Sequence, residues 1–89
     1  MTDDAPWTLR FESRAEKDMR RLDPPMARRV IEALERLLAR DPSLDLRRLQ
    51  GRDEWRLRVG EWRVRLQLDF DARTVVVVRV LPRGRAYER

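Results

Sequence analysis

Cysteine and histidine are both absent from this chain of 89 residues. Their absence excludes disulfides, metal sites built on thiolate or imidazole, cysteine nucleophiles and histidine acid–base catalysis. Lysine and tyrosine are almost absent as well, because Lys17 and Tyr87 are the only residues of these two types. Any catalytic chemistry must therefore come from arginine, aspartate, glutamate or this single tyrosine.

Long apolar runs are also missing. The longest aliphatic run, residues 75–78, ends at Arg79, and the first seven residues include Asp3 and Asp4 without an apolar stretch. A membrane-spanning helix needs about 20 apolar residues, and a secretory signal needs an apolar segment of about 7–15. We expect a cytoplasmic protein that makes no membrane contact and folds as one domain over residues 1–89.

Positive charge is concentrated in the second half of the chain. The whole sequence has 21 basic and 16 acidic residues, which gives a formal net charge of +5. Residues 1–46 contain 9 basic and 10 acidic residues, whereas residues 47–89 contain 12 basic and 6 acidic residues, a net charge of +6. Such a basic region favours a polyanionic partner, and we expect that partner to bind to the second half.

The first half is predicted to form a short strand followed by a helical hairpin over about residues 13–40. Apolar and polar residues alternate from Trp7 to Phe11, which indicates a strand with one buried face. Ser13 and Glu16 fit a capping box at the start of a first helix. The apolar stripe of that helix predicts that it ends near Leu22.

A second, longer helix should follow directly. Asp23 and Pro24 are suited to the N-cap and first-turn positions, because the missing proline N–H would be unpaired there in any case. Apolar residues then recur at helical spacing from Met26 to Leu38. Asp41 and Pro42 are expected to end this helix.

Three strands are predicted in the second half, over residues 54–59, 62–69 and 74–81. Gly60 and Glu61 between the first two form a tight turn suited to type II′ geometry. The fold class is therefore α+β. The N-terminal strand and the helical hairpin pack on one face of a small, twisted antiparallel sheet over about residues 47–83, and a tail follows over residues 83–89.

The two-residue turn fixes which residues face each other across the first two of these strands. Pairing Val59 with Trp62 puts Arg58 opposite Arg63 and Arg56 opposite Arg65 on one face. The other face is then apolar, with Trp55, Leu57, Val64 and Leu66.

The last strand repeats the arginine pattern. Arg79 and Arg83 share one parity, and Val76, Val78 and Val80 share the other and can fill the core. Like charges that face each other across a sheet are unfavourable by roughly 0.2–1 kcal/mol per pair. A solvated strand face is one explanation. We favour a nucleic-acid ligand, because guanidinium groups bind phosphate in a bidentate manner and stack on bases.

Several of these motifs occur together in one known family. The motifs are Leu49-Gln50-Gly51, Trp55-Arg56-Leu57-Arg58-Val59-Gly60 and Trp62-Arg63-Val64, together with Arg83-Gly84 and Tyr87 near the end of the chain. They resemble the sheet half of RelE/ParE toxins of type II toxin–antitoxin systems, and the helical hairpin with Ala15 to Asp18 resembles theirs too. The likeness is to the RelE-like mRNA interferase branch.

The resemblance implies a ribosome-dependent endoribonuclease that cleaves mRNA by attack of the ribose 2′-hydroxyl on the adjacent phosphate and so inhibits translation. Neither a metal nor a cofactor is implied. The residues that match the family's catalytic set are Arg58, Arg63, Arg83 and Tyr87. Further RNA contacts are expected from Arg56, Arg58, Arg65, Arg79 and Arg85.

Within that site, Arg63 and Arg83 would hold the scissile phosphate and Arg56 would orient the strand. Tyr87 is the candidate proton acceptor, because arginine, with a pKa above about 12, does not serve as a general base. The chain departs from the best-known ribonucleases at Arg56 and Arg58, where those have lysine, and a lysine-based proton transfer is thereby in doubt.

Two alternatives stay open. The same fold serves in another branch as a protein-binding inhibitor of DNA gyrase, and a catalytically silent relative would retain only its binding partners. All three functions imply a cognate antitoxin, expected as an acidic and apolar segment that wraps the domain. The ribonuclease also implies mRNA and the ribosome with its rRNA as partners, and the toxin–antitoxin complex is expected to bind operator DNA.

Overall fold

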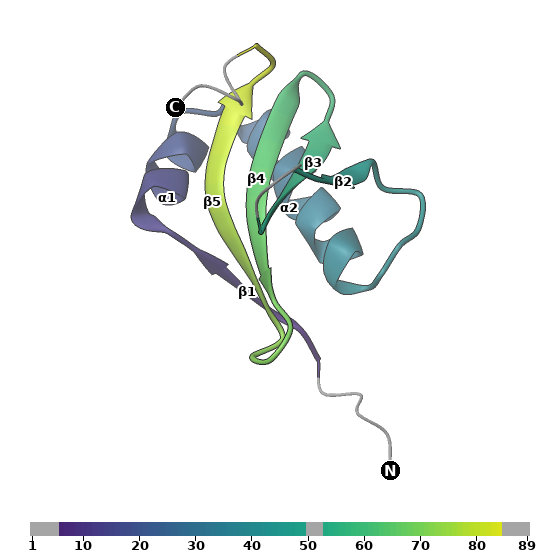
Figure 1. Ribbon diagram of the computed structural model, residues 1–89. Coiled ribbons are helices and arrows are strands. Elements are labelled where there is room, and N and C mark those ends of the chain that lie inside the picture. The colour runs from purple at the N-terminus through teal and green to yellow at the C-terminus, as the bar shows by residue number, and fades with distance from the viewer. Residues whose placement is uncertain (1–5, 50–52, 85–89) are drawn as a thin grey trace.

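The structure, a computed structural model, describes residues 6–49 and 53–84. Two helices and five strands follow one another in the order β1 (Thr8–Phe11), α1 (Ser13–Arg20), α2 (Pro24–Leu38), β2 (Leu46–Arg48), β3 (Glu54–Val59), β4 (Trp62–Asp69) and β5 (Thr74–Pro82) (Figure 1). The predicted α+β class and helical hairpin are confirmed. The short strand β2 is an addition that the sequence did not indicate.

The five strands form one sheet in the order β1-β5-β4-β3-β2. The three predicted strands, β3, β4 and β5, are antiparallel as expected, and the added strand β2 is antiparallel to β3. The strand β1 pairs with β5 in parallel, so the sheet is mixed and not purely antiparallel. A parallel neighbour requires a long crossover connection. Here α1 and α2 lie between β1 and the rest of the sheet in the chain.

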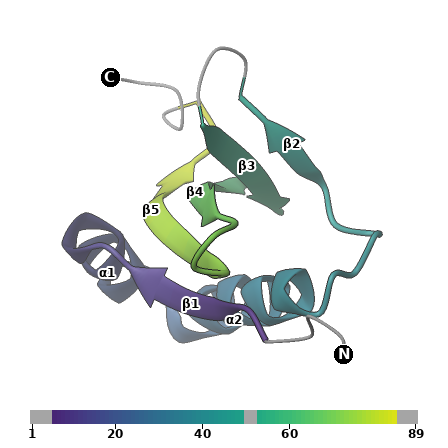
Figure 2. The ribbon, with the colours of Figure 1, turned by 60° about the horizontal axis from the view of Figure 1, so that its bottom comes forward.

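Both helices cover the same side of the sheet. Figure 1 shows α2 behind β3 and β4, and Figures 1 and 2 show α1 beside β5. The core between the layers is aliphatic, and its helical part consists of Ala15, Leu22, Val30, Ala33 and Leu34. The sheet contributes Leu57, Val59, Val64, Leu66, Val75, Val77 and Val80, and the three tryptophans pack at the edge of this cluster.

The ends of the helices differ in how well the sequence predicted them. The capping box is wrong: Ser13 is already helical, Glu12 is the N-cap, and no side chain caps this end. The reason is that Glu12 is still hydrogen-bonded to β5, because its N–H donates to the Val77 carbonyl over 3.0 Å, and the helix begins at the next residue. Asp23 and Pro24 take the predicted N-cap and first-turn positions of α2.

The C-terminal end of α2 turns back sharply. Arg40 has a positive φ of 61°, its N–H donates to the Leu37 carbonyl, and the next N–H, of Asp41, donates to the Arg36 carbonyl. This is the Schellman arrangement, in which a residue with left-handed backbone ends the helix. The Asp41 carboxylate then accepts hydrogen bonds from the Arg36 side chain and from the N–H and hydroxyl of Ser43.

The hairpin of β3 and β4 has the predicted register, with Val59 opposite Trp62 and Leu57 opposite Val64. Gly60 has a positive φ of 58°, whereas Glu61 does not, as in the type II′ turn. The next hairpin departs from the prediction. Leu66 pairs with Val77 and Arg65 with Arg79, so Val78 has no cross-strand partner and forms a β-bulge.

This bulge changes which valines fill the core. Before it, Val75 and Val77 face the helices and Val76 pairs with Gln67 on the opposite face. After it, Val80 faces the helices and Arg79 lies on the arginine side. Val76 is buried as predicted, with 6% of its surface exposed, but it does not belong to the core cluster under the helices. Val78 is only partly buried, so its predicted core role is wrong, because strict alternation across the whole strand allowed for no extra residue.

Candidate nucleic-acid interface

Seven arginines lie on or next to the sheet face opposite the helices, in two rows that cross the strands. We call one the inner row, because its members pair directly across four strands: Arg47, Arg56, Arg65 and Arg79. The other, the turn row, lies at the β3–β4 turn and contains Arg58, Arg63 and Arg83. Arg58 pairs with Arg63 as predicted.

The inner row is largely neutralised by carboxylates. Arg65 donates from Nε and Nη2 to Glu54 Oε1, at 3.1 and 2.6 Å. In β5, Arg79 donates from Nε and Nη2 to the two carboxylate oxygens of Asp18 in α1, at 2.8 and 3.1 Å. These pairs explain how arginines can face one another across the sheet without a bound anion.

Asp18 also completes the backbone hydrogen bonding of β5. The strand β1 pairs only with residues 74–77, so it does not reach Val80. The Val80 N–H donates instead to Asp18 Oδ2 over 2.9 Å. Burial acts to raise the pKa of Asp18, but the hydrogen bonds from Arg79 and Val80 outweigh it, and this pKa lies below its ordinary value.

Asp45, just before β2, lies near three guanidinium groups. Its carboxylate is 3.5 Å from Arg47 Nε, 3.9 Å from Arg56 Nη2 and 3.9 Å from Arg58 Nη1. Its backbone carbonyl accepts the Arg58 N–H over 3.0 Å, which holds the carboxylate at this place. Ion pairs of this length between partly exposed groups are weak, so Asp45 only partly offsets the charge of these arginines.

The turn row is held together by the backbone of the β3–β4 turn. Arg63 is buried, with 6% of its surface exposed, and its Nη1 donates to the carbonyls of Gly60 and Trp62 at 3.0 and 3.1 Å. The Arg83 N–H donates to the Glu61 carbonyl over 2.7 Å. In the described part of the chain, neither Arg63 nor Arg83 forms an ion pair with a carboxylate.

The two rows thus differ in what they can offer a ligand. Arg83 is exposed and the Arg58 side chain is half exposed, at 50%. Beside them, the guanidinium of Arg63 is fixed by two carbonyls, so positive charge is organised before a ligand arrives. An anion the size of a phosphate is the ligand that such a cluster suits.

The predicted site residues are brought together in part. Arg56, Arg58, Arg63, Arg65 and Arg79 lie on one face of the sheet, and Arg83 lies beside the turn. Tyr87 and Arg85 lie outside the described residues. Sequence reasoning missed Arg47 and Asp45, because β2 is only three residues long and gives no readable alternation.

Two kinds of feature are absent from the described residues, 6–49 and 53–84. No three acidic, histidine or cysteine side chains there gather in a way that could hold a metal ion. None of the helices there combines the length and the apolar character that a membrane span requires.

Comparison with known proteins gives a family. The model of the family described as "ParE toxin of type II toxin-antitoxin system, parDE" matches residues 9–87. No curated protein matches the sequence.

Solved structures give a consistent result. The toxin–antitoxin complex RelBE2 of Mycobacterium tuberculosis contains a chain with 30% identity and a TM-score of 0.72, and the match covers 89% of this chain and all of that one. The archaeal RelE–RelB complex of Pyrococcus horikoshii matches over 92% of this chain and all of that one, with 24% identity and a TM-score of 0.75. The intact RelBE toxin–antitoxin complex of Escherichia coli matches over 91% of this chain and all of that one, with 25% identity and a TM-score of 0.71. The chain belongs to the RelE/ParE superfamily of toxins of type II toxin–antitoxin systems.

Proposed function

We propose that this toxin is a ribosome-dependent endoribonuclease and that the turn row binds the phosphate at which mRNA is cut. The observation that carries the proposal is the contrast between the rows. Carboxylates hold Arg65 and Arg79, whereas Arg63 and Arg83 form no ion pair among the described residues and lie at the same turn. Arginines at one turn that have no carboxylate partner leave positive charge that a bound anion would compensate.

In the proposed reaction, the ribose 2′-oxygen forms a bond to phosphorus, and the bond from phosphorus to the 5′-oxygen of the next nucleotide breaks. The products are a 2′,3′-cyclic phosphate and a 5′-hydroxyl. Arg58, Arg63 and Arg83 stabilise the additional negative charge of the pentacoordinate transition state. Tyr87 accepts the 2′-hydroxyl proton, and solvent protonates the leaving oxygen.

The remaining arginines serve in the proposal as the approach to this site. Arg56 orients the RNA backbone next to Arg58, and Arg85 adds charge at the C-terminal side. Arg65 and Arg79 are bound to Glu54 and Asp18. We therefore assign them mainly to the fold, with a smaller contribution to the positive field over the sheet.

An antitoxin partner belongs to the same proposal. The relatives from M. tuberculosis and E. coli have been crystallised as toxin–antitoxin complexes. We infer that this chain is likewise neutralised by a cognate antitoxin in the cytoplasm and that their complex binds operator DNA.

Inhibition of DNA gyrase is the second candidate. It is favoured by the family model, which is that of the ParE toxins and matches nearly the whole chain. The neutralised inner row also fits a function that does not require RNA binding. The two candidates differ in what happens to mRNA and to DNA supercoiling.

The decisive experiment is induction of the toxin in bacteria, followed by mapping of 5′ ends on a reporter mRNA with and without a functional start codon. The proposal predicts cuts only in the translated reporter, and their loss in Arg83→Ala and Tyr87→Phe. Arg28→Ala on the exposed surface of α2 is the matched control, which should still cut. Growth arrest with intact mRNA and loss of gyrase supercoiling activity would replace the ribonuclease by the gyrase inhibitor.

A further inference from the structure

Gly60, the first residue of the β3–β4 turn, is contacted by an arginine that belongs to neither row. A β-carbon added to this glycine would lie 3.0 Å from Nη2, 3.3 Å from Nη1 and 3.5 Å from Cζ of Arg29. The Arg29 guanidinium therefore lies against Gly60 at the place where any other residue would have its side chain. Gly60 is needed both for its positive φ of 58° and for this close approach.

Arg29 reaches the turn from the helix-covered side of the sheet. It belongs to α2, which lies behind β3 and β4 in Figure 1. Arg58 and Arg63 approach the same turn from the opposite face of the hairpin. Because Arg63 Nη1 donates to the Gly60 carbonyl at 3.0 Å, two guanidinium groups meet at one glycine.

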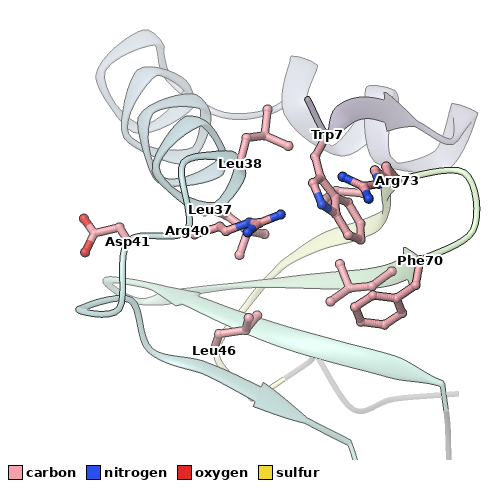
Figure 3. Close-up of a pocket in the computed structure, with 10 residues that line it drawn as sticks. Trp7, Leu37, Leu38, Arg40, Asp41, Leu46, Phe70 and Arg73 are labelled. Carbon is pink, nitrogen blue, oxygen red and sulfur yellow. The ribbon is translucent and has the colours of Figure 1, made fainter. Parts of the chain in front are cut away.

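Another arginine of α2 shows how such a side chain is held by a carboxylate. Arg36 follows Arg29 by about two helical turns and so lies on the same flank of the helix. Its Nε donates to Asp41 Oδ2 over 2.7 Å. Asp41 lies just after the end of α2, and its carboxylate points away from the pocket that Leu37 and Leu46 help to line (Figure 3).

Arg29 has no such partner within the described residues. It is exposed, and it forms neither a hydrogen bond nor an ion pair with any of them. Glu61, the acidic residue of the turn, is exposed too and forms no ion pair with it. Packing against Gly60 thus positions the guanidinium without neutralising it. Positive charge placed in this way, near that of Arg63, favours an anion at the turn.

We propose that Arg29 is a further phosphate-binding residue, which binds an RNA phosphate beside the turn row. That the ligand is RNA rests on the proposed function, whereas the position and the charge of the guanidinium rest on its contact with Gly60. Arg29 extends the site from the open face of the sheet across the turn to α2. Its contribution is to affinity and not to the chemical step, because phosphate contacts of this kind position the nucleic acid.

The first test measures RNA affinity in the absence of cleavage. A single-stranded RNA with 2′-O-methyl groups throughout cannot be cut by 2′-hydroxyl attack, and fluorescence anisotropy follows its binding to the full chain. Loss of one phosphate contact to a single strand lowers the salt exponent of the affinity by about 0.7. Arg29→Ala should therefore weaken binding about tenfold at about 50 mM salt and only about fourfold at about 200 mM.

Two further variants separate a phosphate contact from a general loss of charge. Arg28 precedes Arg29 by one residue, lies roughly 100° round the helix and is exposed. Arg28→Ala removes the same charge and should change the affinity by less than about twofold at both salt concentrations. Arg29→Lys keeps the charge but not the planar fork, so its loss should be intermediate, about threefold at the lower salt concentration.

A double-mutant cycle tests whether the place of Arg29 over the glycine matters. The β-carbon of Gly60→Ala would displace the Arg29 guanidinium, whose nearest atom is 3.0 Å away. Gly60→Ala should therefore weaken RNA binding at least about threefold more in the unmodified chain than in Arg29→Ala. Urea denaturation establishes that each variant is folded. Equal losses in the two backgrounds would contradict a role for Arg29 that depends on this contact.

A second arm of the experiment uses ribosomes without mRNA, because ribosomal RNA offers the same phosphate chemistry. Weaker binding of Arg29→Ala to the oligonucleotide would assign the contact to the strand that is cut. Weaker binding to ribosomes alone would assign it to ribosomal RNA. If Arg29→Ala binds like Arg28→Ala in both arms and at both salt concentrations, Arg29 is not a phosphate-binding residue.

Failure of the proposed function is seen separately. A toxin that binds the oligonucleotide through Arg29 but leaves the reporter mRNA intact would refute the nuclease and leave the role of Arg29 in place. A toxin that cuts mRNA, but whose RNA affinity and salt dependence are unchanged in Arg29→Ala, would refute the role of Arg29 and leave the nuclease in place.

Discussion

The two rows of arginine contain the same residue type on one sheet face, yet their surroundings differ. In the inner row, Arg65 and Arg79 each bind a carboxylate with two nitrogen atoms. In the turn row, Arg63 binds backbone carbonyls and Arg83 is exposed. A carbonyl orients a guanidinium without neutralising it, whereas a carboxylate does both.

This difference indicates that the two rows have different roles. Arginines of the inner row stabilise the fold by linking distant segments, and those of the turn row keep their charge for a ligand. Arg58 is intermediate between the two rows. It pairs with Arg63 of the turn row, but its Nη1 lies 3.9 Å from a carboxylate oxygen of Asp45. Substitutions in the inner row should therefore mainly lower stability, and substitutions in the turn row should mainly lower activity.

The largest effect is expected from Arg63→Ala. The change removes a fixed cation from the turn row, so mRNA cleavage should fall about 100-fold or more. It also leaves the carbonyls of Gly60 and Trp62 without their donor, at a cost of about 1–3 kcal/mol in the free energy of unfolding. Single-turnover cleavage on programmed ribosomes and urea denaturation measure the two quantities. Unchanged cleavage in a folded variant would exclude Arg63 from the site.

Asp18→Asn should act almost entirely on stability. Asn keeps one acceptor for the Val80 N–H but removes the charge that binds Arg79, and Asp18 is only 7% exposed. We expect the free energy of unfolding to fall by about 1–3 kcal/mol. Asp53→Asn is the control, because that carboxylate is 98% exposed and should contribute less than about 0.5 kcal/mol. Equal effects of both changes would contradict the structural role of Asp18.

A smaller effect of opposite sign is expected from Asp45→Asn. Removing this carboxylate leaves the charge of Arg47, Arg56 and Arg58 less compensated, so a short single-stranded RNA should bind up to about fivefold more tightly. Asp53→Asn again serves as control, since it changes the net charge by the same amount. Fluorescence anisotropy at two salt concentrations measures the affinity, and the gain should shrink at high salt. Weaker binding in Asp45→Asn would mean that this carboxylate positions the arginines.

The smallest effect concerns Asp41, which lies outside both rows. Hydrogen bonds from Ser43 and Arg36 lower the pKa of Asp41 to about 2. A lowered carboxylate pKa adds stability that is present above the ordinary value near 3.8 and is lost as the pH falls to about 2. Thermal unfolding of the unmodified chain and of Asp41→Asn should therefore differ at pH 5 and converge toward pH 2. A difference that persists at pH 2 would contradict this assignment.

The hairpin of β3 and β4 shows what the sequence is able to predict. Gly60 allows a two-residue turn, and strict alternation then fixes every pair, including Arg58 with Arg63 and Arg56 with Arg65. The strings Trp55 to Gly60 and Trp62 to Val64 of the family motif belong to this same hairpin. Both signals are local in sequence.

The features that the sequence did not predict depend on distant or isolated residues. The bulge at Val78 lies in a run of four valines, where no residue type marks the extra position. Asp18 and Arg79 are 61 residues apart, so their ion pair follows only from the packing of α1 against β5. For this reason the alternation placed Arg79 on the correct face but gave no sign of its carboxylate partner.

The division between the rows is tested most directly by Arg79→Ala and Arg83→Ala, each assayed for both mRNA cleavage on the ribosome and free energy of unfolding. Both substitutions remove one positive charge from the same face of the sheet. The account predicts that Arg83→Ala lowers cleavage about 100-fold and leaves stability within about 0.5 kcal/mol. Arg79→Ala should lower stability by about 1–3 kcal/mol and leave the cleavage rate of the folded protein nearly unchanged. Equal loss of cleavage in both variants would contradict the division and return Arg79 to the RNA-binding surface.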